Sequence, residues 1–118
     1  MKKLTPTEEL AMQAVWRTGE GNIKSFMENM EEPAPYTTVA SIIRNLEKKG
    51  YIRSRLVGNA YLFTPLVSEA DYKKKFMGSL VKEYFDNSYK VLVNFFVEQK
   101  KISVKELKEI IQMIGKGK

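Results

Sequence analysis

One segment restricts the possible folds of this chain more than any other: YIRSRLVGNAYLFTP, residues 51–65. Its β-branched and aromatic residues lie on both sides of Gly58-Asn59, a pair that suits a two-residue β-hairpin turn. Pro65 is expected to end the second strand. The segment therefore predicts one hairpin, and the rest of the chain shows helical patterns.

Three helices are predicted before the hairpin. The motif Thr5-Pro6-Thr7-Glu8 combines a capping box with a proline in the first turn, and glycines follow at positions 19 and 21. Asn22 is expected to cap a second, short helix. A third helix is predicted from Thr37 to Lys49, with Thr37 or Thr38 as its N-cap and Gly50 in the terminating position. Three helices and then a hairpin predict a winged helix-turn-helix domain over residues 1–67, in a mainly α protein.

Residues 68–118 are predicted to form a second, helical domain of three helices. Phe76, Leu80 and Tyr84 recur at four-residue intervals in the first, and Leu107 and Ile111 lie on one stripe of the last. The segment between them, VLVNFFV, is apolar around almost the whole helix. About 50 residues are too few to bury this surface within themselves, so we expect a partner to cover it. Packing on the chain's own winged helix is the alternative.

The composition argues against several functions. The chain has no cysteine and no histidine, so it lacks disulfides, thiolate metal ligands and the usual general base at neutral pH. It also lacks a phosphate-binding glycine loop and a paired-carboxylate motif, so we expect no enzyme, no metal and no cofactor. No signal peptide is recognisable, and the longest nearly apolar run, residues 91–97, is too short to span a bilayer. We therefore expect a cytoplasmic protein without membrane insertion.

The positive charge is concentrated around the third helix and the hairpin. The chain carries a net charge of +6, and residues 33–66 contain five basic residues against Glu47 alone. Residues 1–32, in contrast, contain more acidic than basic residues. A basic region of this kind favours an anionic partner.

The third helix has a polar face that suits DNA. At about 100° per residue, Val39, Ile42, Ile43 and Leu46 lie on one side, and short hydroxyls, an amide and two cations lie on the other. Arginine can bridge guanine or hold a phosphate, and asparagine suits adenine. The second helix of a helix-turn-helix lies in the major groove, with its N-terminal residues towards the bases. We therefore predict contacts with double-stranded DNA through Thr37, Thr38, Ser41, Arg44, Asn45 and Lys48, and from the wing through Arg53, Arg55 and Asn59.

Other readings of these residues remain open. Arg44 could pair with Glu47 on a solvated surface. Arg53 and Arg55 could be edge-strand charges that discourage aggregation. Tyr72, Tyr84 and Tyr89 could line a pocket of a small-molecule-responsive winged-helix regulator, although such aromatic stripes are more often core. A winged-helix module for protein interaction is a further alternative, disfavoured by the single acid on the third helix.

Four motifs in order resemble the BlaI/MecI penicillinase-repressor family of bacterial transcriptional repressors. They are Glu8, Met12 and Trp16 at four-residue spacing; TTVASIIRNLEKKG in the third helix; GNAYLFTPLVS in the wing; and VLVNFFVEQKKISVKELKEIIQMI near the C-terminus. The resemblance covers roughly Leu4 to Ile114. At the start of the recognition helix, Thr37 and Ala40 stand where β-lactam-responsive members tend to carry basic residues, so a different operator sequence is expected.

The resemblance implies a homodimeric repressor that binds a palindromic DNA operator. Its C-terminal helices would form the dimer, with Phe76, Leu80, Tyr84, Val91, Leu92, Phe95, Phe96, Leu107 and Ile111 as the dimerisation residues. In members that answer β-lactams, a membrane sensor metalloprotease triggers cleavage at an Asn-Phe bond in this region. Asn94-Phe95 is the matching dipeptide here. The alternative reading of Asn94 is a polar interruption of an otherwise apolar helix.

Overall fold

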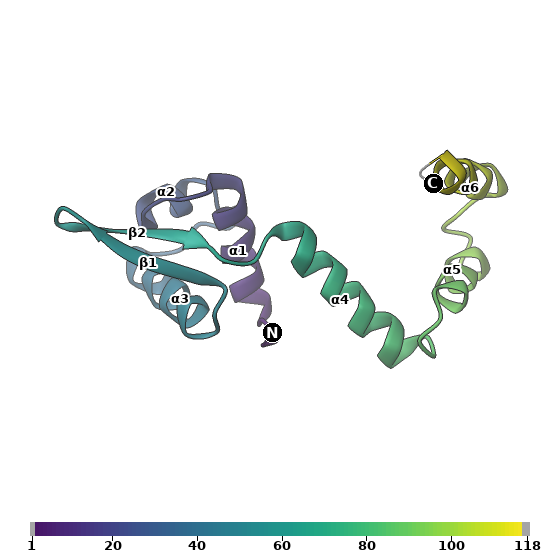
Figure 1. The fold of residues 1–118 in the computed structure, drawn as a ribbon, viewed down its shortest axis with the longest axis horizontal. Helices are drawn as coiled ribbons and strands as arrows, with labels where there is room; N and C mark the ends of the chain where they lie inside the picture. Colours follow the sequence, from purple (N-terminus) through teal and green to yellow (C-terminus); the bar gives the residue numbers. More distant parts are fainter. Residues whose placement is uncertain (1, 117–118) are drawn as a thin grey trace. The chain divides into compact units, whose positions relative to one another are not determined.

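The structure is a computed structural model that describes residues 2–116. Within these residues, six helices and one antiparallel hairpin follow one another (Figure 1). Their bounds are α1 Pro6–Thr18, α2 Ile23–Glu28, α3 Tyr36–Lys48, β1 Ile52–Val57, β2 Ala60–Pro65, α4 Glu69–Tyr84, α5 Tyr89–Glu98 and α6 Val104–Lys116. The predicted fold class, a winged helix followed by a helical C-terminal region, is confirmed.

The chain divides into two compact units, Met1–Lys73 and Lys74–Lys118. The first contains α1 to β2 and the first turn of α4. The second contains the rest of α4 together with α5 and α6. The functional division at residues 67/68 stays a prediction.

The core of the first unit lies where α1, α2 and α3 meet the base of the hairpin. Its largest fully buried side chains include Tyr51, Phe26, Met12 and Ile43. Trp16, whose indole Nε1 donates to the Val67 carbonyl at 2.8 Å, ties the chain beyond the hairpin back to α1. Burial of this contiguous apolar set is the main favourable term holding the three helices together.

Local capping signals begin and end these helices. Thr5 and Glu8 form the predicted capping box of α1, and Asn22 accepts a hydrogen bond from the Ser25 amide as the N-cap of α2. At the end of α3, Gly50 has φ +83 and its amide donates to the Glu47 carbonyl, while the Tyr51 amide donates to the Leu46 carbonyl. These two bonds form a Schellman motif, which turns the chain from α3 into β1.

The hairpin has the predicted two-residue turn. Val57 pairs with Ala60 across Gly58-Asn59, and Gly58 adopts φ +61. At the base, the backbone of Gly21 exchanges two hydrogen bonds with Phe63, at 3.1 and 2.8 Å. This short bridge fastens β2 to the turn between α1 and α2. The hairpin itself projects past the helices in Figure 1.

The second unit is built from helices with few buried side chains. Ser88 caps α5, and Ser103 with Glu106 forms the predicted capping box of α6. Val81 and Leu92 are its buried apolar residues among those described. Most of the other apolar side chains of α5 and α6 are exposed.

Candidate functional site

The two faces of α3 differ as the sequence predicts. Val39, Ile42, Ile43 and Leu46 are buried in the core of the first unit. The opposite face is exposed along the whole helix and carries no acid. It presents Thr37, Thr38, Ser41, Arg44, Asn45 and Lys48. The structure therefore brings together all six residues predicted on this helix, on one accessible strip.

The start of α3 differs from the prediction. The helix begins at Tyr36, its N-cap is Pro35, and no side chain caps it. The expectation that Thr37 or Thr38 serves as N-cap is wrong. With φ −62 and ψ 151, Pro35 already has the extended conformation of an N-cap, and its carbonyl accepts the first helical bond, from Val39, at 3.0 Å. Both threonine hydroxyls therefore stand at the surface of the first turn without a capping role.

Arg44 and Glu47 do not pair. Glu47 Oε2 instead accepts hydrogen bonds from the Ser54 amide, at 3.1 Å, and from its hydroxyl, at 2.5 Å. Arg44 makes no ion pair with any residue in the described part of the chain. Glu47 thus fixes β1 against α3, and the Arg44 guanidinium stays available to a partner.

The hairpin also has two different faces. Ile52, Ser54 and Phe63 lie on the face that packs towards the core and α3. Because strand residues alternate, Arg53 and Arg55 lie on the other face. The predicted wing arginines therefore do not share a surface with the side of the hairpin that faces α3.

Arg55 is engaged by an acid that the sequence reasoning missed. Its Nη2 lies 2.8 Å from Glu20 Oε1, and Thr64 Oγ1 donates to Glu20 Oε2 at 2.7 Å. The hydrogen bond from Arg55 holds the pKa of Glu20 below its usual value, and Glu20 raises the pKa of Arg55. The two residues are 35 positions apart, so no local pattern could have revealed this pair.

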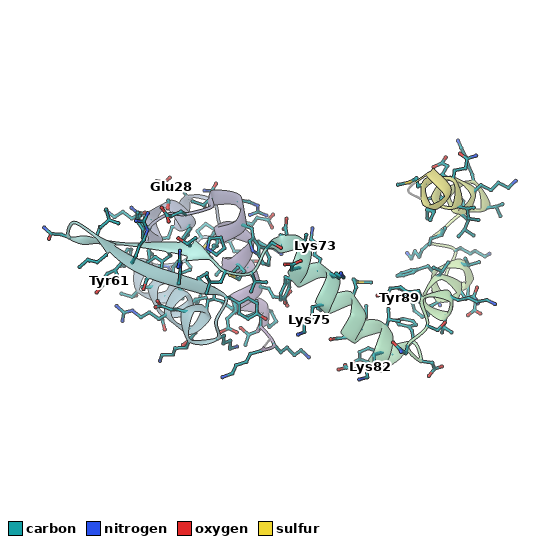
Figure 2. All side chains as sticks on the ribbon, in the orientation of Figure 1. Glu28, Tyr61, Lys73, Lys75, Lys82 and Tyr89 are labelled. Carbon is teal, nitrogen blue, oxygen red and sulfur yellow. The ribbon has the colours of Figure 1, made fainter. Side chains whose placement is uncertain are left out.

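A hollow of about 670 Å³ lies between α2, α3 and the α3-facing side of the hairpin. It contains Arg44 and Asn59 from the predicted set. Lys24, Tyr36 and Tyr61 also line it, and the sequence reasoning did not select them; Figure 2 labels Tyr61 on the hairpin. The remaining lining residues are Asn22, Ile23, Glu47, Ser54, Ala60 and Phe63.

Of the tyrosines considered for a ligand pocket, Tyr72 belongs to the first unit, and Tyr84 and Tyr89 belong to the second. In the first unit, the Tyr72 ring packs 5.5 Å from Trp16 and 6.0 Å from Tyr51, measured between ring centroids. Burial, and then the charge of Glu9, raise the pKa of Tyr72 to about 12, which suits a packed aromatic residue. In the second unit, Tyr84 and Tyr89 are exposed.

The predicted dimerisation residues are mostly exposed in the second unit. Leu92 is buried, Leu80 and Leu107 are half-buried, and the exposed members are Phe76, Tyr84, Val91, Phe95, Phe96 and Ile111. Asn94 and Phe95 lie in the middle of α5, and the Phe95 ring packs between Phe85 and Phe96, at 5.6 and 5.7 Å.

Across residues 2–116, no three acidic, histidine or cysteine side chains lie together as metal ligands. None of the helices in this same range is long and apolar enough to cross a bilayer.

The family model described as penicillinase repressor matches residues 4–116. The chain belongs to the penicillinase repressor family. Two relatives of the family illustrate the match. The penicillinase repressor of Bacillus licheniformis is 22% identical over 123 residues, covering 100% of this chain and 96% of the relative. The methicillin resistance regulatory protein MecI of Staphylococcus aureus (strain N315) is 22% identical over 116 residues, covering 97% and 94%.

The match to the penicillinase repressor family model confirms the resemblance predicted from the four motifs. It is a family of transcriptional repressors, and its DNA-binding role accords with the winged helix seen here. At 22% identity, most side chains differ from those of the relatives.

Proposed function

We propose that this protein is a sequence-specific DNA-binding repressor that acts as a homodimer on a palindromic operator. The observation that carries the proposal is the exposed strip of α3, which presents short hydroxyls, an amide and two cations on a winged helix. A helix with this surface approaches base edges closely, because short side chains leave room for the groove floor.

The roles along α3 follow from side-chain chemistry. Thr37, Thr38 and Ser41 lie in the N-terminal half, which points towards the bases in a helix-turn-helix. Arg44, without an ion pair among the described residues, is placed to bridge guanine N7 and O6 or to hold a phosphate, and Asn45 suits adenine. Lys48, near the end of the helix, would neutralise a phosphate. At the wing, Asn59 would contact the backbone, as would Arg53 and Arg55.

A homodimer is supported by the apolar surface of the second unit. Val91, Phe95 and Ile111 are exposed, on two different helices. Soluble proteins rarely leave this much apolar surface uncovered. Two copies related by a twofold axis would cover it with the same surface on each side and would present two α3 helices to two half-sites.

Repression would end when α5 is cut. The family resemblance supplies the expected bond, Asn94-Phe95, and the expected trigger, a membrane sensor metalloprotease. A chain ending at Asn94 would lack Phe95, Phe96 and all of α6. We expect this truncated chain to lose most of its operator affinity, because the truncation removes much of the proposed dimer surface. Full-length affinity in such a truncated chain would contradict this part of the proposal.

The decisive test is a fluorescence-anisotropy titration with the DNA immediately upstream of the protein's own gene. A shuffled duplex is the reference, and both are measured at several salt concentrations. We expect a strong preference for the upstream DNA that persists as salt rises. Replacing Arg44 with Ala should weaken operator binding by about 1–3 kcal/mol and relax specificity at one position. Equal binding to both duplexes that collapses with salt would reject the repressor function.

A further inference from the structure

The hollow between α2, α3 and the hairpin has the charge of an anion site. Lys24 and Arg44 line it, and neither makes an ion pair within residues 2–116. Its one lining acid, Glu47, directs a carboxylate oxygen to the amide and hydroxyl of Ser54, at 3.1 and 2.5 Å. Two hydrogen bonds hold that negative charge at the β1 wall. The rest of the hollow therefore favours a negatively charged occupant.

Two tyrosines give the hollow donors suited to phosphate oxygens. Tyr36, at the first residue of α3, is 50% exposed, and Tyr61, on β2, is 58% exposed. Their half-exposed rings leave the hollow open to solvent. A small-molecule pocket usually encloses most of its ligand, whereas a polymer needs an open passage. The exposure thus favours a chain of phosphates over a buried metabolite.

The walls of the hollow agree with the position that a DNA strand would take. When α3 lies in a major groove, the sugar–phosphate backbone runs beside it, and the preceding helix of the motif crosses that backbone. Here α2 provides Lys24 and the hairpin provides Tyr61, which Figure 2 labels, and both line the same hollow as Arg44 of α3. Lysine and tyrosine are common donors to phosphates, which position the protein without reading sequence.

We propose that this hollow holds the sugar–phosphate backbone of one operator strand, with Lys24, Tyr36 and Tyr61 as phosphate contacts. The inference rests on the proposed DNA-binding function and extends it to three residues outside the exposed strip of α3. Lys24 supplies a charge and the tyrosines supply neutral donors. Arg44 spans both surfaces, since it belongs to the strip and also lines the hollow.

The test compares Lys24→Gln with Lys108→Gln, an exposed lysine of α6, because each variant lowers the net charge from +6 by one. Operator and shuffled DNA are titrated from 0.05 to 0.3 M salt. Loss of one phosphate contact should reduce the steepness of the log–log salt dependence by about 0.9. That change corresponds to roughly fivefold weaker binding at 0.15 M salt, equal for both duplexes. Lys108→Gln should have a smaller effect on both the salt dependence and the affinity at 0.15 M salt.

Tyr61→Phe tests a neutral donor in the same hollow. We expect about threefold weaker binding to both duplexes with an unchanged salt dependence, because one hydrogen bond and no charge is removed. Thermal unfolding of each variant is measured alongside, and the exposed positions should leave it unchanged.

The outcomes separate this inference from the proposed function. If the unmodified protein does not prefer the operator, the repressor function fails. If it does prefer the operator but Lys24→Gln behaves like Lys108→Gln, the hollow is not a phosphate site. A selective loss of operator binding by Lys24→Gln, with the salt dependence unchanged, would make Lys24 a base contact and would also overturn the inference.

Discussion

At the scale of single residues, Glu8 connects the first helix to the end of α3. Its side chain is only 7% exposed. The carboxylate accepts a hydrogen bond from the Thr5 amide at 2.8 Å and lies 2.5 Å from Lys49 Nζ. Burial alone would raise its pKa, but the hydrogen bonds from Lys49 and Thr5 outweigh that and hold the pKa below its usual value. The charged carboxylate is therefore part of the folded structure that supports α3.

Replacing Glu8 with Gln should lower the free energy of unfolding by about 1–3 kcal/mol at neutral pH, because Lys49 loses its charged partner. A pKa lowered by folding adds stability that is complete above the unfolded carboxyl pKa, about 4.3, and is lost as pH falls through the folded value. The free energies of unfolding of the two proteins should therefore become similar at acid pH. Urea unfolding from pH 7 to pH 3 measures this, with Glu28→Gln, an exposed glutamate on α2 (Figure 2), as control. A difference in unfolding free energy that stays the same at every pH would contradict the role of the Glu8 charge.

Glu20 holds Arg55, one of the proposed DNA contacts, in an ion pair. Both side chains of this pair are well exposed, so Glu20→Gln should leave the free energy of unfolding nearly unchanged. It should, however, release the guanidinium for a phosphate and steepen the log–log salt dependence of DNA binding by about 0.9. Anisotropy titrations compare it with Glu28→Gln, which makes the same change in net charge. Equal salt dependence in the two variants would show that Arg55 lies away from the DNA.

At the scale of elements, the end of α3 depends on one glycine. Gly50 has φ +83, and a β-carbon there would meet no atom within 4 Å, so only backbone conformation opposes a side chain. Gly50→Ala should therefore cost roughly 1–2 kcal/mol. The matched control is Gly78→Ala in the interior of α4, where the space is also open; it should gain about 0.5–1 kcal/mol. The midpoint temperatures of thermal unfolding should fall for Gly50→Ala and rise for Gly78→Ala. Shifts of the same sign would contradict the conformational role of Gly50.

The features that sequence predicts best in this molecule are those with a local cause. The capping boxes at Thr5 and Ser103 and the turn at Gly58-Asn59 involve residues within three positions of one another, so their chemistry can be read directly. The start of α3 was missed by one residue because Pro35 takes the N-cap conformation without offering a capping side chain.

The features that escaped prediction depend on contacts between distant segments. The ion pair of Glu20 with Arg55 and the bridge of Gly21 with Phe63 both join the turn after α1 to the hairpin. On α3 the polar strip was predictable because helical periodicity decides it. The hollow was not, since Lys24 and Tyr61 come from other elements whose approach no local pattern encodes.

At the scale of the whole molecule, we expect a partner to cover the exposed apolar side chains of the second unit. Ile111 is 65% exposed on α6, and Val91 and Phe95 are exposed on α5. Burying apolar surface contributes about 25 cal/mol per Å² removed from water, so covering several such side chains in a twofold interface is strongly favourable. For a repressor with one α3 per chain, dimerisation also joins two weak half-site interactions into one tight complex.

Ile111→Glu should consequently separate the dimer and weaken operator binding, because a charge cannot be buried in an apolar interface without a partner. The neighbouring substitution Gln112→Glu, also exposed on α6, makes the same change in net charge and should leave the dimer intact. Sedimentation equilibrium compares the masses, and anisotropy compares operator affinity at the same protein concentration. A variant that becomes monomeric, keeps its helical circular dichroism and loses operator affinity would place dimerisation in the second unit. If Ile111→Glu remains dimeric with full affinity, the interface lies elsewhere, and the exposed apolar surface of α6 must serve another partner.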